Sequence, residues 1–117
     1  MKVLAIDQGT TATKSFTLDE SGRFESVTAF EHGQIYPNAG WVEHDAEELL
    51  RNVSACLKAA GTVDAIGIDN QGETVVAWEA GTGRPIYNAI VWQDNRTQDI
   101  TEKLKANGAE ELTRMRA

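Results

Sequence analysis

One amphipathic helical pattern, placed between two groups of strand-like segments, restricts the fold more than any other feature. Residues 46–60 carry apolar side chains at helical spacing, and Gly61 is a natural stop. The apolar stripe consists of Leu49, Leu50, Val53, Cys56, Leu57 and Ala60. Asp45 is the expected N-cap, and Glu48 three residues later resembles a capping box. A strand that follows such a helix is expected to run parallel to an earlier strand, so the sequence predicts an α/β fold.

The segments on either side of this helix have strand or helix patterns of their own. Before it, alternation and β-forming residues predict an antiparallel meander, with strands at residues 3–7, 13–18 and 23–34. After it, we expect a buried strand at 63–69, another strand at 74–78, a short apolar segment at 89–92 and a second helix at 97–107. Ile100 and Leu104 would face inward on that second helix. Two helices are few for so many strands, which suggests further sequence downstream.

Composition excludes several classes of protein. The net charge is -7, from 11 basic and 18 acidic residues, which argues against a nucleic-acid or anionic-membrane partner. The single cysteine, Cys56, allows no internal disulfide and is compatible with a reducing compartment. The N-terminus lacks the pattern of a signal peptide, and no apolar run approaches the ~20 residues that span a bilayer. We therefore expect a cytoplasmic protein.

A Gly/Thr turn between the first two strands is the first candidate for chemistry. Residues 7–14 read Asp-Gln-Gly-Thr-Thr-Ala-Thr-Lys. Such a turn can aim several N–H groups at one concavity, and these nests bind phosphate. Gly9 permits close backbone approach, Lys14 can add a positive charge, and Asp7 can hold Mg²⁺. An ordinary hairpin turn with a capping Asp explains this spacing equally well, and it is not a Walker A loop.

Two further polar segments are candidates for a substrate site. Residues 70–74 read Asn-Gln-Gly-Glu-Thr and follow a predicted strand, where polar groups often line ligand crevices. Glu73 can accept a hydrogen bond from a substrate hydroxyl, and Trp92 can stack on the apolar face of a sugar or polyol. Taken alone, each segment is better explained as a polar turn or as a packing tryptophan.

The remaining polar and aromatic residues carry no functional hypothesis. His32 and His44 have no metal-binding partner at useful spacing, and Asp69 is a lone carboxylate at a strand end. Trp41 and Trp78 are expected to be packing residues, and Cys56 is expected to lie in the core.

Taken together, four ordered blocks resemble the FGGY carbohydrate kinases, and the glycerol kinase branch most closely. They are D-Q-G-T-T at 7–11, Q-I-Y-P-x-x-G-W-V-E-H-D at 34–45, N-Q-x-E-T at 70–74 and G-x-P-I-Y-N-A-I-V-W-Q at 83–93. The resemblance covers nearly the whole chain. It implies an actin-like, ribonuclease H-like ATPase fold with a mixed sheet flanked by helices.

The resemblance also implies an activity and a set of site residues. Family members have two such domains and move the γ-phosphate of MgATP to a substrate hydroxyl in the cleft between them. By position, the residues facing the phosphates would be Thr10, Thr11, Ala12 and Lys14. Asp7 would face the metal, and Gly72, Glu73 and Trp92 would lie at the polyol. This chain would form the N-terminal part of the first domain (residues 1–117), with the second domain absent.

Departures from the family pattern limit what this chain can do. Gly72 stands where the glycerol kinase branch has an Arg that donates to glycerol, and Lys14 replaces another Arg. The catalytic Asp and the adenine site of the family lie downstream, so we expect no catalytic residue here and no turnover by the chain alone. The resemblance leaves a homo-oligomer of the full-length protein open. Two other interpretations remain: a non-catalytic nucleotide- or sugar-binding module on the same fold, and a structural remnant without a ligand.

Overall fold

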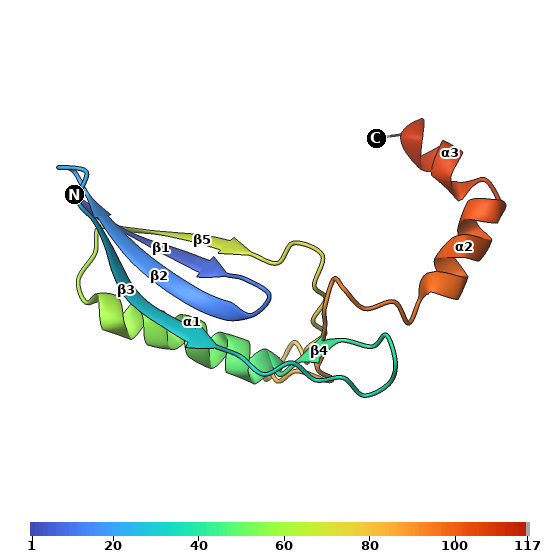
Figure 1. Cartoon of the computed structure of the whole chain (residues 1–117), viewed down its shortest axis with the longest axis horizontal. Coiled ribbons are helices and arrows are strands. Elements are labelled where there is room, and N and C mark those ends of the chain that lie inside the picture. The colour runs from blue at the N-terminus through green and yellow to red at the C-terminus, as the bar shows by residue number, and fades with distance from the viewer. Residues whose placement is uncertain (117) are drawn as a thin grey trace.

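A four-stranded mixed sheet forms the main body of the protein in the computed structural model, which describes residues 1–116 (Figure 1). Its strands are β1 (Lys2–Gln8), β2 (Ala12–Asp19), β3 (Phe24–Glu31) and β5 (Ala65–Asn70), in the order β3-β2-β1-β5. The first three strands form the predicted antiparallel meander, although β3 ends earlier than expected. Strand β5 pairs parallel with β1, so the predicted crossover is confirmed.

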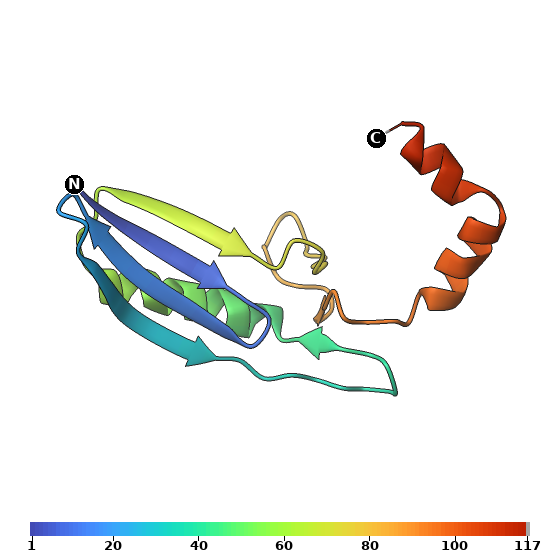
Figure 2. The same cartoon turned by 45° about the horizontal axis from the view of Figure 1, so that its top comes forward.

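Helix α1 (Ala46–Ala60) covers one face of the sheet and has the predicted bounds. Figures 1 and 2 show it lying along β1, β2 and β3. The core between helix and sheet contains Leu4, Ile6, Cys56 and Ala60, with Phe30, Val53 and Val63 packed against it. The helical stripe is thus buried on one side only, and Leu50 remains 67% exposed.

The start of α1 differs from the expected capping box. The Asp45 carboxylate accepts a hydrogen bond from Glu47 N at 2.9 Å, as an N-cap should. The Glu48 carboxylate accepts instead from Gly33 N at 3.0 Å. Glu48 therefore ties the helix to the segment after β3 and does not close a capping box.

The strand predicted at residues 63–69 is present as β5, but the prediction that it is buried was wrong. The register places Ile66 and Ile68 beside Leu4 and Ile6 of β1, on the face that α1 covers. However, α1 lies over the other three strands, and Ile66 and Ile68 remain 52% and 57% exposed. A strand at the edge of a sheet is buried only when another element covers it.

A smaller layer lies beyond the carboxyl ends of β1 and β5 (Figure 1). It pairs β4 (Glu43–His44) antiparallel with β6 (Ala89–Ile90). The prediction of a strand at residues 74–78 was wrong. These residues join the layer only through isolated bridges, from Val75 to Ile90 and from Trp78 to Pro85.

The C-terminal helices α2 (Gln98–Ala106) and α3 (Ala109–Arg114) extend away from the sheet (Figures 1 and 2). The second helix was predicted at nearly these residues. The prediction that Ile100 and Leu104 face inward was wrong, since these side chains are 58% and 53% exposed. Distance from the sheet is the reason: no strand of the described chain lies against this helix. Over the described residues, no helix is long and apolar enough to cross a membrane.

Candidate functional site

The Gly/Thr turn forms a tight connection at the carboxyl end of β1. Gly9 N donates to Ala12 O at 3.0 Å, and the β1–β2 register sets Asp7 opposite Lys14. Asp7, Thr11 and Lys14 are exposed. A Cβ at Gly9 would lie 3.4 Å from Ala12 O and 3.5 Å from Asp7 Oδ1, which are ordinary van der Waals distances.

Two side chains that were given no role hold the turn in place. The buried His32 ring places Nε2 3.1 Å from both Gly9 O and Thr10 O, and Gln34 Nε2 donates to Thr10 O at 2.8 Å. Both partners of His32 Nε2 are carbonyl oxygens, so this nitrogen carries the proton and donates. The bonds engage carbonyl groups that would otherwise repel an anion. No local spacing signals them, because they join residues 22 to 24 positions apart.

A second histidine, His44, supports His32 from β4. The two rings lie 5.0 Å apart, edge to face. Burial lowers the pKa of His44, and the nearby His32 lowers it further. His44 therefore stays neutral at neutral pH and acts here as a packing group.

Trp92 joins the Gly/Thr turn to the segment after β5. Its indole Nε1 donates to Thr10 Oγ1 at 2.9 Å, and its backbone N donates to Thr74 Oγ1 at 3.3 Å. Residues from three separate blocks of the sequence thus meet at one place beyond the sheet. This arrangement sets a ring beside a polar turn, which suits a ligand with both hydroxyl and charged groups.

The other two residues predicted at the substrate site, Gly72 and Glu73, are exposed. They lie within a turn closed by Thr74 N donating to Gln71 O at 3.2 Å. A Cβ at Gly72 would meet nothing within 4 Å, and the backbone there has no positive φ. A larger side chain therefore fits at Gly72 without strain.

Asp69 has a partner that the sequence analysis missed. The parallel register sets it directly beside Asp7, on neighbouring strands that lie ~4.8 Å apart. Both line a shallow hollow on the open face of the sheet, together with Ala5, Phe16 and Gly67. The available signal was the shared ending of the two strands, Ile6-Asp7 and Ile68-Asp69. Two neighbouring carboxylates repel each other, and a cation between them relieves that repulsion.

A buried ionic cluster fastens the turn that carries Trp92. Arg96 Nη2 lies 2.7 Å from Glu43 Oε1 and 2.7 Å from Asp94 Oδ2, and the side chains of Glu43 and Asp94 are 1% and 3% exposed. Asp94 Oδ2 also accepts from Val42 N at 2.7 Å. The guanidinium carbon of Arg96 lies 3.9 Å from the ring centre of Trp41, which is half-buried as a packing residue should be.

The cluster is fully charged at neutral pH. The hydrogen bond from Arg96 lowers the pKa of Asp94 to about 2. Burial alone would raise the pKa of Glu43, but hydrogen bonds from Asn88, Arg96 and Tyr87 outweigh it and lower the pKa. Asp94 in turn raises the pKa of Arg96. The segment before α1 and the segment before α2 are thereby joined in one rigid unit.

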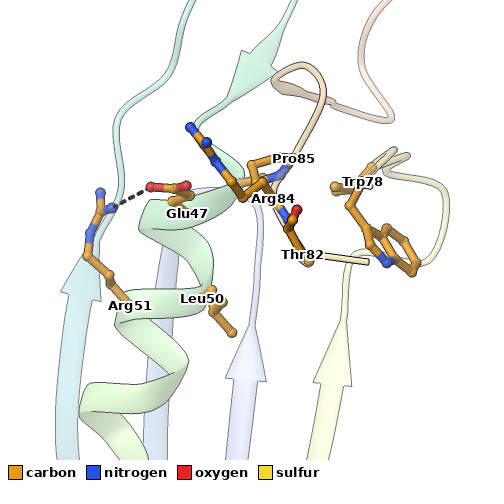
Figure 3. A pocket seen from close by; sticks show the side chains of 10 residues that line it. Glu47, Leu50, Arg51, Trp78, Thr82, Arg84 and Pro85 are labelled. Carbon is orange, nitrogen blue, oxygen red and sulfur yellow. Dashed lines mark hydrogen bonds and ion pairs between the residues drawn. The ribbon is translucent and has the colours of Figure 1, made fainter. Parts of the chain in front are cut away.

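A separate cavity of about 570 Å³ lies between the start of α1 and residues 76–85 (Figure 3). Leu50 and Pro85 line it, and Arg51 pairs there with Glu47 at 3.8 Å. Trp78, also in its lining, is 61% exposed, so its expected packing role was wrong. None of the residues predicted from the sequence to bind phosphate, metal or polyol lines this cavity.

Comparison with known proteins identifies the family. Residues 2–117 match the N-terminal domain of the FGGY family of carbohydrate kinases. Over 117 residues, the chain is 51% identical to a glycerol kinase of Clavibacter michiganensis subsp. michiganensis, covering 93% of this chain and 23% of that protein. It is 49% identical over 120 residues to a glycerol kinase of Haemophilus influenzae. That match covers 96% of this chain and 24% of that protein. The chain thus spans about a quarter of the length of these relatives.

Solved structures show the same fold. Plasmodium falciparum glycerol kinase with ADP superimposes with a TM-score of 0.75 at 35% identity, over 90% of this chain and 23% of that one. Ligand-bound xylulose kinase from Lactobacillus acidophilus superimposes with a TM-score of 0.85 at 24% identity, over 97% of this chain and 24% of that one. The actin-like fold is therefore confirmed, and the described sheet is part of such a domain.

Proposed function

The chain belongs to the FGGY family of carbohydrate kinases, and we propose that it supplies the phosphate-binding turn and part of the polyol site of an ATP-dependent kinase. The reaction would transfer the γ-phosphoryl group of MgATP to a substrate hydroxyl. Residues 1–117 would be the N-terminal part of the first of two domains. The observation that carries this proposal is the hydrogen bond from Trp92 to Thr10, because it sets the phosphate turn beside the polyol segments.

The phosphates would lie against the Gly/Thr turn. Backbone N–H groups and the hydroxyls of Thr10 and Thr11 would donate to phosphate oxygens near Ala12, and Lys14 would add one positive charge. His32 and Gln34 support this role by engaging the carbonyl oxygens of the turn.

A magnesium ion fits the two carboxylates at the ends of β1 and β5. Asp7 would hold it and Asp69 would assist, with water completing the shell, since Mg²⁺ in phosphate sites usually takes only one or two carboxylates. No three metal-binding side chains gather anywhere in residues 1–116, so these two carboxylates would be the protein ligands that this part of the chain supplies. Bound there, the ion would neutralise phosphate charge during transfer.

The substrate would be a polyol or sugar held near Glu73 and Trp92. Glycerol kinases are among the relatives, which supports this class. Glu73 is exposed and free to accept from a hydroxyl, and the Trp92 ring is half exposed, as a stacking platform requires. The open space at Gly72 suits a polyol longer than glycerol.

Kinase activity of the intact protein tests this proposal. ADP release is measured with a panel of three- to five-carbon polyols and sugars, for wild type, Thr11→Val and the control Thr62→Val, an exposed threonine outside the site. Thr11→Val should lower kcat/KM for ATP by the equivalent of about 1.5–3 kcal/mol, because it loses one hydrogen bond to a charged phosphate. Thr62→Val should match wild type. Ligand binding without turnover by the intact protein would favour the non-catalytic binding module.

A further inference from the structure

The hydrogen bond between Trp92 and Thr10 has a fixed direction. An indole N–H only donates, so Thr10 Oγ1 accepts at 2.9 Å. A hydroxyl has one hydrogen to donate besides its lone pairs. The hydroxyl hydrogen of Thr10 therefore remains available for an oxygen of a bound phosphate. The resulting chain has two donors, the Trp92 N–H to Thr10 Oγ1 and the Thr10 O–H to the phosphate, whose oxygen accepts.

Both ends of this bond are held by other contacts. The Thr10 carbonyl accepts from His32 and Gln34, so the turn is fixed on one side. The backbone N of Trp92 donates to Thr74, and Asp94 two residues later belongs to the buried ionic cluster with Arg96. A contact between residues 82 positions apart is thus built from two supported segments and does not depend on two loose side chains.

We propose that Thr10 and Trp92 couple the binding of the nucleotide phosphates to the binding of the polyol. The inference rests on the proposed function. An anion that accepts from the Thr10 hydroxyl polarises it and makes Oγ1 a stronger acceptor for the Trp92 N–H. The Trp92 ring is then held where the polyol stacks. Because coupling between two binding sites is reciprocal, a bound polyol strengthens phosphate binding by the same factor.

A double-mutant cycle on the intact protein tests the coupling. The dissociation constant of glycerol, or of the best polyol from the kinase assay, is measured by calorimetry with and without the magnesium complex of a non-hydrolysable ATP analogue. The ratio of the two constants is the coupling factor. Wild type should show at least ~5-fold coupling, the lower end of common values. Thr10→Val and Trp92→Phe should each reduce it to below ~2-fold, and the double variant should reduce it no further.

Three matched variants separate coupling from general damage. Thr10→Ser keeps the hydroxyl and should retain the wild-type coupling factor. Trp78→Phe removes an exposed tryptophan outside the site and should also retain it. Trp92→Phe keeps an aromatic ring, so polyol binding without nucleotide should change less than the coupling factor does.

Each contrary result has a distinct meaning. The coupling would be overturned, with the kinase proposal left intact, by any of three results. The coupling factor of wild type could be one, the coupling factor of Trp92→Phe could equal that of wild type, or the double variant could lose the product of the two single losses. A wild-type protein that binds neither the nucleotide nor any polyol would overturn the proposed function and the coupling with it.

Discussion

At the scale of single residues, the site depends on neighbours that lie far apart in the sequence. Asp7 has Asp69 beside it on β5 and Lys14 opposite it on β2. Thr10 has His32 beneath its carbonyl group and Trp92 at its hydroxyl. The identity of a residue therefore suggests its chemistry, whereas its partner decides whether that chemistry can be used.

The paired carboxylates lead to a prediction about metal binding. Asp7→Asn should weaken Mn²⁺ binding to the intact protein in the presence of ADP at least tenfold, and Asp69→Asn should weaken it severalfold, because each removes one negative charge next to the ion. Calorimetric titration with Mn²⁺ measures both, and Asp99→Asn on α2 is the control. Unchanged affinity in Asp7→Asn would show that the metal binds elsewhere.

The open position at Gly72 leads to a prediction about substrate choice. Wild type should have a higher kcat/KM for four- and five-carbon polyols than for glycerol, and Gly72→Arg should shift the ranking towards glycerol. An added guanidinium fills the space and supplies donors for a small triol, and a site built to bind a hydroxyl discriminates strongly.

Steady-state kinetics with glycerol, a four-carbon and a five-carbon polyol checks that ranking. Gly81→Arg, at another exposed glycine with open space, is the control for the added charge. If wild type already favours glycerol and Gly72→Arg leaves the order unchanged, Gly72 does not set specificity.

At the scale of elements, the small β4–β6 layer places the site. Its strands contain only two residues each, so their ladder alone is weak. The buried charges of Glu43, Asp94 and Arg96 supply the missing connection between the chain before α1 and the chain before α2. Gly40 lies at the same junction, where a Cβ would collide with Asn95 and φ is 77°. These constraints keep Trp92 near the Gly/Thr turn.

The ionic cluster predicts a specific dependence of stability on pH. The pKa of Asp94 falls from 3.8 to about 2 on folding. A lowered pKa stabilises the folded state above the unfolded value, and this stabilisation disappears as pH falls from about 4 through 2. Its size at neutral pH is about 2 kcal/mol. Asp94→Asn should therefore be less stable than wild type at pH 7, with a gap that narrows as pH falls towards 2.

Urea unfolding at pH 7, 4 and 2.5 measures that gap, with Glu31→Gln on the exposed end of β3 as the control. A gap between Asp94→Asn and wild type that stays constant over this range would show that the Asp94 charge does not stabilise the fold.

At the scale of the whole molecule, the described chain leaves apolar surface uncovered. The edge strand β5 exposes Ile66 and Ile68, and the helix α2 exposes Ile100 and Leu104. The chain spans about a quarter of the length of its relatives. These surfaces support the proposal that it is part of a longer kinase.

The incomplete site predicts that the 117-residue chain alone releases no ADP with any polyol. Phosphoryl transfer needs an oriented nucleophile as well as bound phosphates, and the family resemblance places the catalytic Asp downstream. A coupled assay of ADP release checks this, with the Asp7→Asn chain as the control for contaminating kinases. Turnover in the wild-type chain that disappears in Asp7→Asn would contradict the prediction.

Local pattern alone determined the features that depend on neighbouring residues. The bounds of α1, the meander of β1 to β3 and the position of the Gly/Thr turn all follow from periodicity, caps and turn residues within a few positions. The four ordered blocks added the family. These predictions succeeded because a helix stripe or a tight turn is encoded within a single segment.

Only the tertiary structure decided which segments meet. The exposure of β5 depends on where α1 crosses the sheet, and the Asp7–Asp69 pair depends on the register between β1 and β5. His32 contacts Thr10 from 22 positions away, and Arg96 pairs with Glu43 from 53 positions away. A contact of that kind leaves no periodic trace in either segment, because each side chain is free to serve as surface or core until the sheet brings its partner beside it.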